Sequence, residues 1–220
     1  MKQSFCFYWF LSVQVTFLAN SGSALTGNEI VEKLQDQLRE YTTFSMDFEK
    51  EFYWAALNKT RSRKGKIEIQ NPNQFRVQLD NGDVMVADGI TVWSYVEHNK
   101  QVVISDYDSG SSNPWQVFVD YSSVFVPTVV EETKIAGRSA YMLSMREKSS
   151  NEEGRLLKVW VDKKKWWLLQ IESSESNGDL TTFKMKDHKV NKKNKPGKFL
   201  FIIPDSIDVL DRRYTPPMME

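Results

Sequence analysis

The apolar positions along the chain follow one period near the start and another afterwards. In the segment "TGNEIVEKLQDQLREY", Ile30, Leu34 and Leu38 recur at four-residue steps, which is the spacing of one face of an α-helix. Thr26 and Glu29 stand three residues apart at its start, the spacing of a capping box. We therefore expect one amphipathic helix here, with its apolar face packed against another element.

After this helix the period changes to two. The segment "TFSMDFEKEFYW" places Phe44, Met46 and Phe48 on one face of a strand and polar residues on the other. Similar segments follow, separated by short links such as Asn81-Gly82 and Asp88-Gly89, which tolerate the positive φ angles of tight hairpin turns. About ten or eleven strands with such links predict an antiparallel sheet, because parallel strands need long crossovers.

Several of these strands are apolar on both faces. In "VMVADGITVWSYVEHNKQVVI", Trp93 and Tyr95 point one way while Val92 and Val96 point the other. A strongly curved sheet of about eleven strands encloses more room than its own side chains fill, since about eight strands is the limit for a filled interior. The pattern therefore favours an apolar cavity suited to a lipid-like ligand, with ordinary core packing as the alternative for each residue.

One apolar segment interrupts the strand pattern at residues 106–128. It contains Asn113-Pro114, a pair typical of a helix start, and places Trp115, Phe118 and Val119 on one face of the short helix that follows. The segment fits either a mobile lid over the cavity or a fixed helix that plugs one end of the β core.

The first 24 residues have the pattern of an export signal. A single charge, Lys2, precedes a mostly apolar run and then small residues suited to a signal peptidase. A membrane anchor is the alternative, but the apolar run is shorter than the roughly 20 residues that span a bilayer. We expect a signal peptide at residues 1–24 and a single domain at 25–220. Cys6, the one cysteine, then leaves with the signal.

Nothing in the sequence points to catalysis, to a metal or to a cofactor. The two histidines, His98 and His188, fall in polar stretches where we expect surface residues, and no pair of side chains has metal-ligand spacing. The lysine-rich residues 184–198 lack the aromatics of a nucleic-acid site and are expected to form a solvated turn. A formal net charge of +0 also argues against nucleic acid as a partner. Distant carboxylates that meet in the fold would leave a hydrolase as an alternative.

The order of these features resembles the periplasmic outer-membrane lipoprotein carrier (LolA) family over about residues 26–212. The resemblance rests on the initial helix, on an aromatic strand and on a strand that ends in Pro-x-x-Phe. It also rests on a hairpin with Asp-Gly, Trp and Tyr, on a proline-led apolar helix and on the closing strands. The matching segments are "FSMDFEKEF", "GKIEIQNPNQF", "VADGITVWSY", "GSSNPWQVF", "SNGDLTTFKM" and "FLFIIPDSIDVLD".

The resemblance implies a mainly β (α+β) fold: a half-open antiparallel β-barrel of about eleven strands, with the N-terminal helix and short lid helices over an apolar cavity. It implies a monomeric periplasmic carrier without cofactors or covalent chemistry. Such a carrier takes acylated lipoproteins from an inner-membrane lipoprotein-releasing ABC transporter to an outer-membrane acceptor. A sensor or acceptor module of the same fold, which binds lipid or lipoprotein without shuttling it, is the second hypothesis.

Two sets of residues follow from this interpretation. Family members often carry an arginine before the proline of the Pro-x-x-Phe strand, where it tethers the lid. Asn71 occupies that position here and cannot form the same charged fork, so we expect lid control to involve Asn71 and the nearby Arg76. The residues expected to contact acyl chains in the cavity and lid are Leu34, Leu38, Phe44, Met46, Phe48, Phe75, Val77, Trp93, Tyr95, Trp115, Phe118 and Val119.

Overall fold

The computed structural model describes residues 25–108, 124–148 and 156–213. Its first element is the expected helix, α1 (Gly27–Glu40). The capping box is confirmed: Thr26 Oγ1 accepts a hydrogen bond from the Glu29 amide at 3.3 Å, and the Glu29 carboxylate accepts one from the Thr26 amide at 2.7 Å. None of the helices in the described ranges is both long and apolar enough to cross a membrane.

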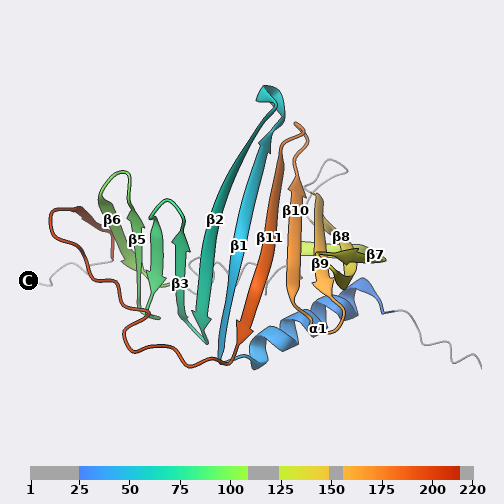
Figure 1. Cartoon of the computed structure of the whole chain (residues 1–220), viewed down its shortest axis with the longest axis horizontal. Helices are drawn as coiled ribbons and strands as arrows, with labels where there is room; N and C mark the ends of the chain where they lie inside the picture. The colour runs from blue at the N-terminus through green and yellow to red at the C-terminus, as the bar shows by residue number, and fades with distance from the viewer. Residues whose placement is uncertain (1–24, 109–123, 149–155, 214–220) are drawn as a thin grey trace, which may run out of the picture.

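The strands form one sheet in the order β12-β6-β5-β4-β3-β2-β1-β11-β10-β9-β8-β7 (Figure 1). The expected half-open sheet is confirmed, with twelve strands in the described ranges instead of about eleven. The elements after α1 are β1 (Thr43–Trp54), the 3₁₀ helix η1 (Ala55–Leu57), β2 (Lys59–Gln70), β3 (Gln74–Leu79), β4 (Val84–Ala87), β5 (Thr91–Val96), β6 (Gln101–Asp106), β7 (Phe125–Ile135), β8 (Arg138–Glu147), β9 (Leu156–Asp162), β10 (Leu168–Ser174), β11 (Leu180–Val190) and β12 (Asp208–Asp211).

The sheet is built from two antiparallel meanders that meet in its middle. Strands β1 to β6 follow one another outward, whereas β7 starts at the far edge and β8 to β11 return until β11 pairs with β1. The register there places Phe48 opposite Met185. After β11 the chain crosses to the β6 edge (Figure 1), where β12 pairs in parallel, with Val209 opposite Val102. This parallel pair departs from the expected antiparallel pattern, because a long connection precedes it.

The tight turns expected within the first meander are present. Gly82 lies between β3 and β4 with a φ of 92°, and Gly89 lies between β4 and β5 with a φ of 101°. The Asp88 carboxylate accepts hydrogen bonds from the amides of Ile90 and Thr91, each at 2.8 Å. These bonds fix the register of β5 on β4 by satisfying the turn's own backbone donors.

The sheet curls around α1, so that strands far apart in its order contribute to one apolar cluster. We call the side of the sheet that faces α1 the inner face. The inner face supplies buried side chains from β1–β5 and from β7–β11 to the same cluster as α1. This interior cluster consists of Ile30, Val31, Leu34, Leu38, Tyr41, Phe44, Met46, Ile67, Ile69, Phe75, Ala87, Val92, Phe125, Leu143, Met145, Leu157, Val159, Val161, Leu168, Ile171 and Met185.

The lysine-rich stretch is not the solvated turn that the sequence suggested, since its first half belongs to strand β11. Lys184 and Lys186 are exposed, while Met185 between them belongs to the interior cluster and Phe183 before them packs against it. Lysine at alternate positions is compatible with a strand, because alternate residues point to opposite faces. Ser45 of β1 lies opposite Lys189 of β11, and Asp47 lies opposite Lys186, so β11 has one extra residue between these two pairs. This β-bulge includes Asp187, which has a φ of 54°.

One close approach on the inner face yields a testable prediction. A Cβ atom at Gly65 would lie 2.6 Å from Phe48 Cζ, 2.8 Å from the Gln78 carbonyl oxygen and 2.9 Å from Leu79 Cδ2. Gly65→Ala should therefore lower the free energy of unfolding by about 1–3 kcal/mol through overpacking. Urea denaturation measures this change. Thr60→Ala, at an exposed position of the same strand, should change stability by less than about 0.5 kcal/mol. An equally stable Gly65→Ala variant would contradict the close packing.

Candidate functional site

The candidate site is the apolar interior between α1 and the inner face of the sheet. α1 buries Ile30, Val31, Leu34 and Leu38 along one stripe, as its four-residue spacing predicts. A cavity of about 20 Å³ remains beneath the helix. Every lining residue is apolar: Val31, Leu34, Leu143, Met145, Val159, Leu168 and Ile171.

The volume of this cavity is far smaller than that of a ligand-binding pocket. Binding sites for small molecules typically measure about 300–1,000 Å³, whereas about 20 Å³ is close to the space of a single water molecule. An acyl chain therefore has no room beneath α1 as it is seated here. Among the described residues, this part of the interior can take up a ligand only if α1 moves away from β8–β10.

Most of the residues expected to line the cavity that fall in the described ranges are brought together. Leu34, Leu38, Phe44, Met46 and Phe75 are buried members of the interior cluster. Phe48 and Val77 pack against its margin and are partly buried. The three residues expected in the lid, Trp115, Phe118 and Val119, lie outside the described residues.

Trp93 and Tyr95 occupy the other face of the sheet, so the expectation that they line the interior is wrong. They pack with Val102 and Ile104 of β6 and with Phe201 and Ile207 of the segment that follows β11. Their neighbour Val92 points to the interior cluster instead. Both faces of β5 are apolar because each is covered, one by the interior cluster and the other by the C-terminal segment.

Asn71, expected in lid control, contacts α1 in the structure. Its side-chain amide donates hydrogen bonds to the carbonyl oxygens of Tyr41 at 2.5 Å and Leu38 at 3.4 Å. It thus satisfies carbonyls that a helix C-terminus leaves without intrahelical partners. Arg76 does not share this position: it lies opposite Val86 of β4, on the face of β3 that alternates with Phe75 and Val77.

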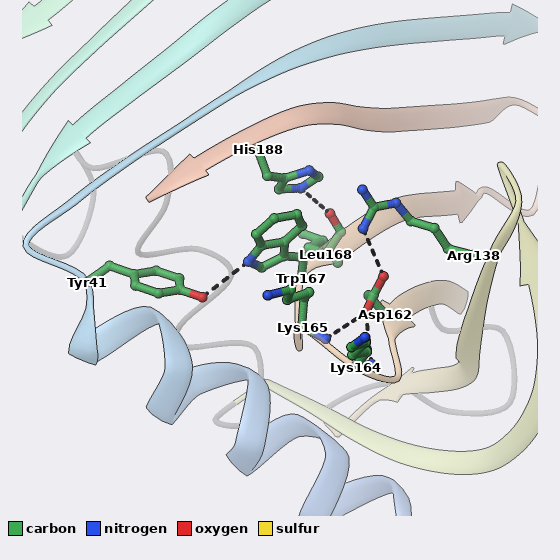
Figure 2. A network of polar contacts seen from close by, with 8 residues as sticks. All are labelled: Tyr41, Arg138, Asp162, Lys164, Lys165, Trp167, Leu168 and His188. Atoms are coloured by element: carbon green, nitrogen blue, oxygen red, sulfur yellow. Dashed lines mark hydrogen bonds and ion pairs between the residues drawn. The ribbon is translucent and has the colours of Figure 1, made fainter. Parts of the chain in front are cut away.

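A polar network at the same end of α1 was missed from the sequence (Figure 2). Trp167 Nε1 donates a hydrogen bond to the Tyr41 hydroxyl at 3.1 Å. The indole stacks on the ring of His188, with centroids 4.8 Å apart, and His188 Nε2 lies 2.8 Å from the Leu168 carbonyl oxygen. Burial lowers the pKa of His188, and Arg138 adds to the effect by charge repulsion. His188 is therefore a half-buried packing residue, not the surface residue expected.

The turn between β9 and β10 supports this network (Figure 2). The Asp162 carboxylate accepts hydrogen bonds from Arg138 Nη1 at 3.0 Å and from the amides of Lys164 and Lys165 at 2.8 and 2.6 Å. Burial alone would raise the pKa of Asp162, but these hydrogen bonds and the guanidinium charge outweigh it and lower the pKa. The turn also presents Trp166 to α1, with Lys33 Nζ 5.5 Å from its ring centroid.

The described part of this site offers apolar contacts. The cavity walls carry no titratable group. Within the described ranges, no cluster of three or more His, Cys, Asp or Glu side chains is arranged to hold a metal ion.

Comparison with known proteins links this fold to one family. The model of the family described as "Outer membrane lipoprotein carrier protein LolA" matches residues 39–202. The outer-membrane lipoprotein carrier protein of Haemophilus ducreyi is 23% identical over 201 residues, covering 90% of this chain and 93% of that protein. Its counterpart in Chromohalobacter salexigens is 23% identical over 207 residues, covering 93% and 97%. The crystal structure of an uncharacterized conserved protein from Thermus thermophilus shares the fold, with a TM-score of 0.58, 16% identity and coverage of 84% and 98%.

The contact between Asn71 and α1 leads to a prediction about the helix end. Asn71→Ala should remove the hydrogen bonds to Leu38 and Tyr41, and should lower the free energy of unfolding by about 1 kcal/mol. Asn71→Asp should cost more, because a carboxylate repels the carbonyl oxygens. Hydrogen exchange at the amides of the last turn of α1 would report the local effect. Asn73→Ala in the same turn is the control, and equal exchange in all variants would contradict the capping role.

The environment of His188 predicts how stability depends on pH. Its lowered pKa means that the unfolded chain takes up the proton first as the pH falls below about 6.5. The free energy of unfolding should therefore fall between about pH 7.5 and pH 5.5, and this slope should be shallower in His188→Gln. Urea denaturation across this range measures the slope. His98→Gln, in an exposed turn, controls for the loss of a histidine, and identical slopes for His188→Gln and the parent protein would contradict the prediction.

Proposed function

The chain belongs to the outer-membrane lipoprotein carrier (LolA) family, and from this premise we propose that it is a periplasmic carrier for acylated lipoproteins. It receives the acyl chains from an inner-membrane lipoprotein-releasing ABC transporter and delivers them to an outer-membrane acceptor. No bond in the cargo is made or broken. The observation that carries the proposal is the apolar interior, in which one helix packs on a curled sheet and only apolar residues line the small cavity between them.

The energetics of such a cargo fit this interior. An acyl chain exposed to water costs about 0.8 kcal/mol for each CH₂ group, so a lipoprotein anchor cannot cross an aqueous compartment unprotected. The interior offers apolar side chains from both meanders of the sheet and from α1. Since these contacts are apolar on all sides, they offset the cost for acyl chains of different lengths without requiring a specific fit.

The attachments of α1 suggest how the interior opens. Its C-terminal end is continuous with β1 through residues 41–42 and is held by Asn71 and by Trp167 through Tyr41. Its N-terminal end rests on β7, where a Cβ atom at Gly27 would lie 2.8 Å from Pro127 Cβ. In the proposed cycle, α1 swings away from β7 about its C-terminal end, acyl chains replace its apolar stripe on the inner face, and it reseats after release.

A reversible crosslink tests the carrier and its opening together. The double variant Gly27→Cys/Pro127→Cys, prepared without residues 1–24, places two cysteines where a disulfide can form after a small backbone adjustment. We expect the reduced protein to bind a triacylated lipopeptide and the oxidised protein to bind it at least about tenfold more weakly, because binding requires α1 to move. Native mass spectrometry detects the complex, and the non-acylated peptide is the control ligand.

The movement of α1 and the lipoprotein cargo are contradicted by different results. Equal binding in the reduced and oxidised forms would show that ligand enters without movement of α1. No binding by the parent protein, or only free phospholipid recovered with the protein purified from its own periplasm, would contradict a lipoprotein cargo. Stable retention of lipopeptide that is never released to acceptor vesicles would favour a sensor over a carrier.

A further inference from the structure

The hairpin formed by β1 and β2 extends beyond β3 (Figure 1), whereas on its other side β11 pairs with β1 as far as Tyr53, which lies opposite Leu180. β1 and β2 contain 12 residues each, and β3 pairs with β2 from Gly65 onward. The outer half of β2, residues 59–64, is therefore exposed along its whole length. Such a projecting hairpin adds little to the interior cluster, so its sequence calls for another explanation.

The tip of the hairpin exposes apolar side chains. Trp54 is 43% exposed and Leu57 50% exposed, on either side of Ala55 and Ala56. The tip is also well ordered by polar contacts: the Asn58 amide donates to the Ala55 carbonyl at 3.2 Å, and the Ala55 amide donates to the Asp179 carboxylate at 2.8 Å. The apolar side chains are thus held outward on a preformed turn.

Behind the tip, one face of the hairpin collects positive charge. The register places Lys50 opposite Arg63, Phe52 opposite Arg61, and Trp54 opposite Lys59. Because residues two apart share a face, these six side chains form one surface with four cations, two aromatics and no carboxylate. We call it the basic-aromatic face.

The opposite face of the hairpin differs in charge. It carries Glu49 and Glu51, which contact Ser62 at 2.8 Å and Lys184 Nζ at 2.7 Å respectively. Across residues 50–64 the chain has five basic side chains and one acidic one, a net of +4 in a protein whose formal net charge is +0. The positive charge is therefore concentrated at one projecting element.

We propose that the β1–β2 hairpin docks on a membrane surface rich in anionic lipids. Tryptophan favours the boundary between water and hydrocarbon, and each Lys or Arg near an anionic surface adds about 1 kcal/mol of attraction. From the tip backward, the hairpin presents apolar residues and then basic residues, which is the order of hydrocarbon and phosphates in a bilayer surface. Trp54 and Leu57 lie at the tip. Arg61 and Arg63 lie about 7 and 13 Å behind Lys59 along the strand, where they would face the lipid phosphates.

Vesicle co-sedimentation with the empty protein tests this inference without reference to its cargo. The protein should bind vesicles of phosphatidylethanolamine and phosphatidylglycerol, and it should bind vesicles of phosphatidylethanolamine and phosphatidylcholine at least about tenfold more weakly. High salt should weaken the binding to anionic vesicles, since it screens the cations. Arg61→Glu/Arg63→Glu and Trp54→Ser/Leu57→Ser should each weaken it by at least about tenfold.

The matched control has the same change in net charge at the other end of β1. Lys192 and Lys193 are exposed just after β11, close to where β1 begins, and Lys192→Glu/Lys193→Glu should bind anionic vesicles nearly as well as the parent protein. Circular dichroism confirms that each variant is folded. Equal binding to both kinds of vesicle, no binding to either, or an equal loss in the control variant would overturn the proposal. Capture of an acidic protein in place of anionic vesicles would overturn it in favour of a protein partner.

Discussion

A single helix cannot by itself cover the inner face of a twelve-stranded sheet, and the rest of the structure depends on how this mismatch is resolved. α1 has 14 residues and is about 21 Å long, whereas twelve strands laid flat would span about 53 Å. The sheet resolves it by curling, so that side chains from β5 and β7, near its two edges, reach the cluster that α1 closes. The bend of the sheet is therefore what brings the two halves of the sheet to one interior cluster.

The apolar contacts and the polar contacts of α1 have different roles. The apolar stripe of α1 provides contact area that any apolar chain can replace, because it has no directional preference. The polar contacts at the C-terminal end, from Asn71 and from Trp167, are directional and fix where the helix sits. In the proposed cycle, a ligand replaces the stripe while the directional contacts keep the position of the helix end.

The sequence predicted what depends on local pattern and missed what depends on distant contacts. The capping box at Thr26, the alternation of Phe44 and Met46 and the turn at Gly89 are each set within a few residues. The face occupied by Trp93 could not be predicted from period two, because both faces of β5 are apolar. Its partners, Phe201 and Ile207, lie about a hundred residues later in the chain.

His188 illustrates a second limit, which is the effect of one extra residue on register. The bulge near Asp187 shifts the alternation of β11 by one position, and His188 then points to Phe44 and Trp167.

The interior and the hairpin are connected by the same alternation. Met46 and Phe48 belong to the inner face, and two-residue steps along β1 from Phe48 lead to Lys50, Phe52 and Trp54 of the basic-aromatic face. The surface proposed to meet the membrane is therefore the outward continuation of the wall proposed to hold the acyl chains. If the hairpin docks as proposed, the margin of the interior at Phe48 comes close to the bilayer. An acyl chain would then pass from wall to membrane along one continuous face, with less of its length exposed to water at each step.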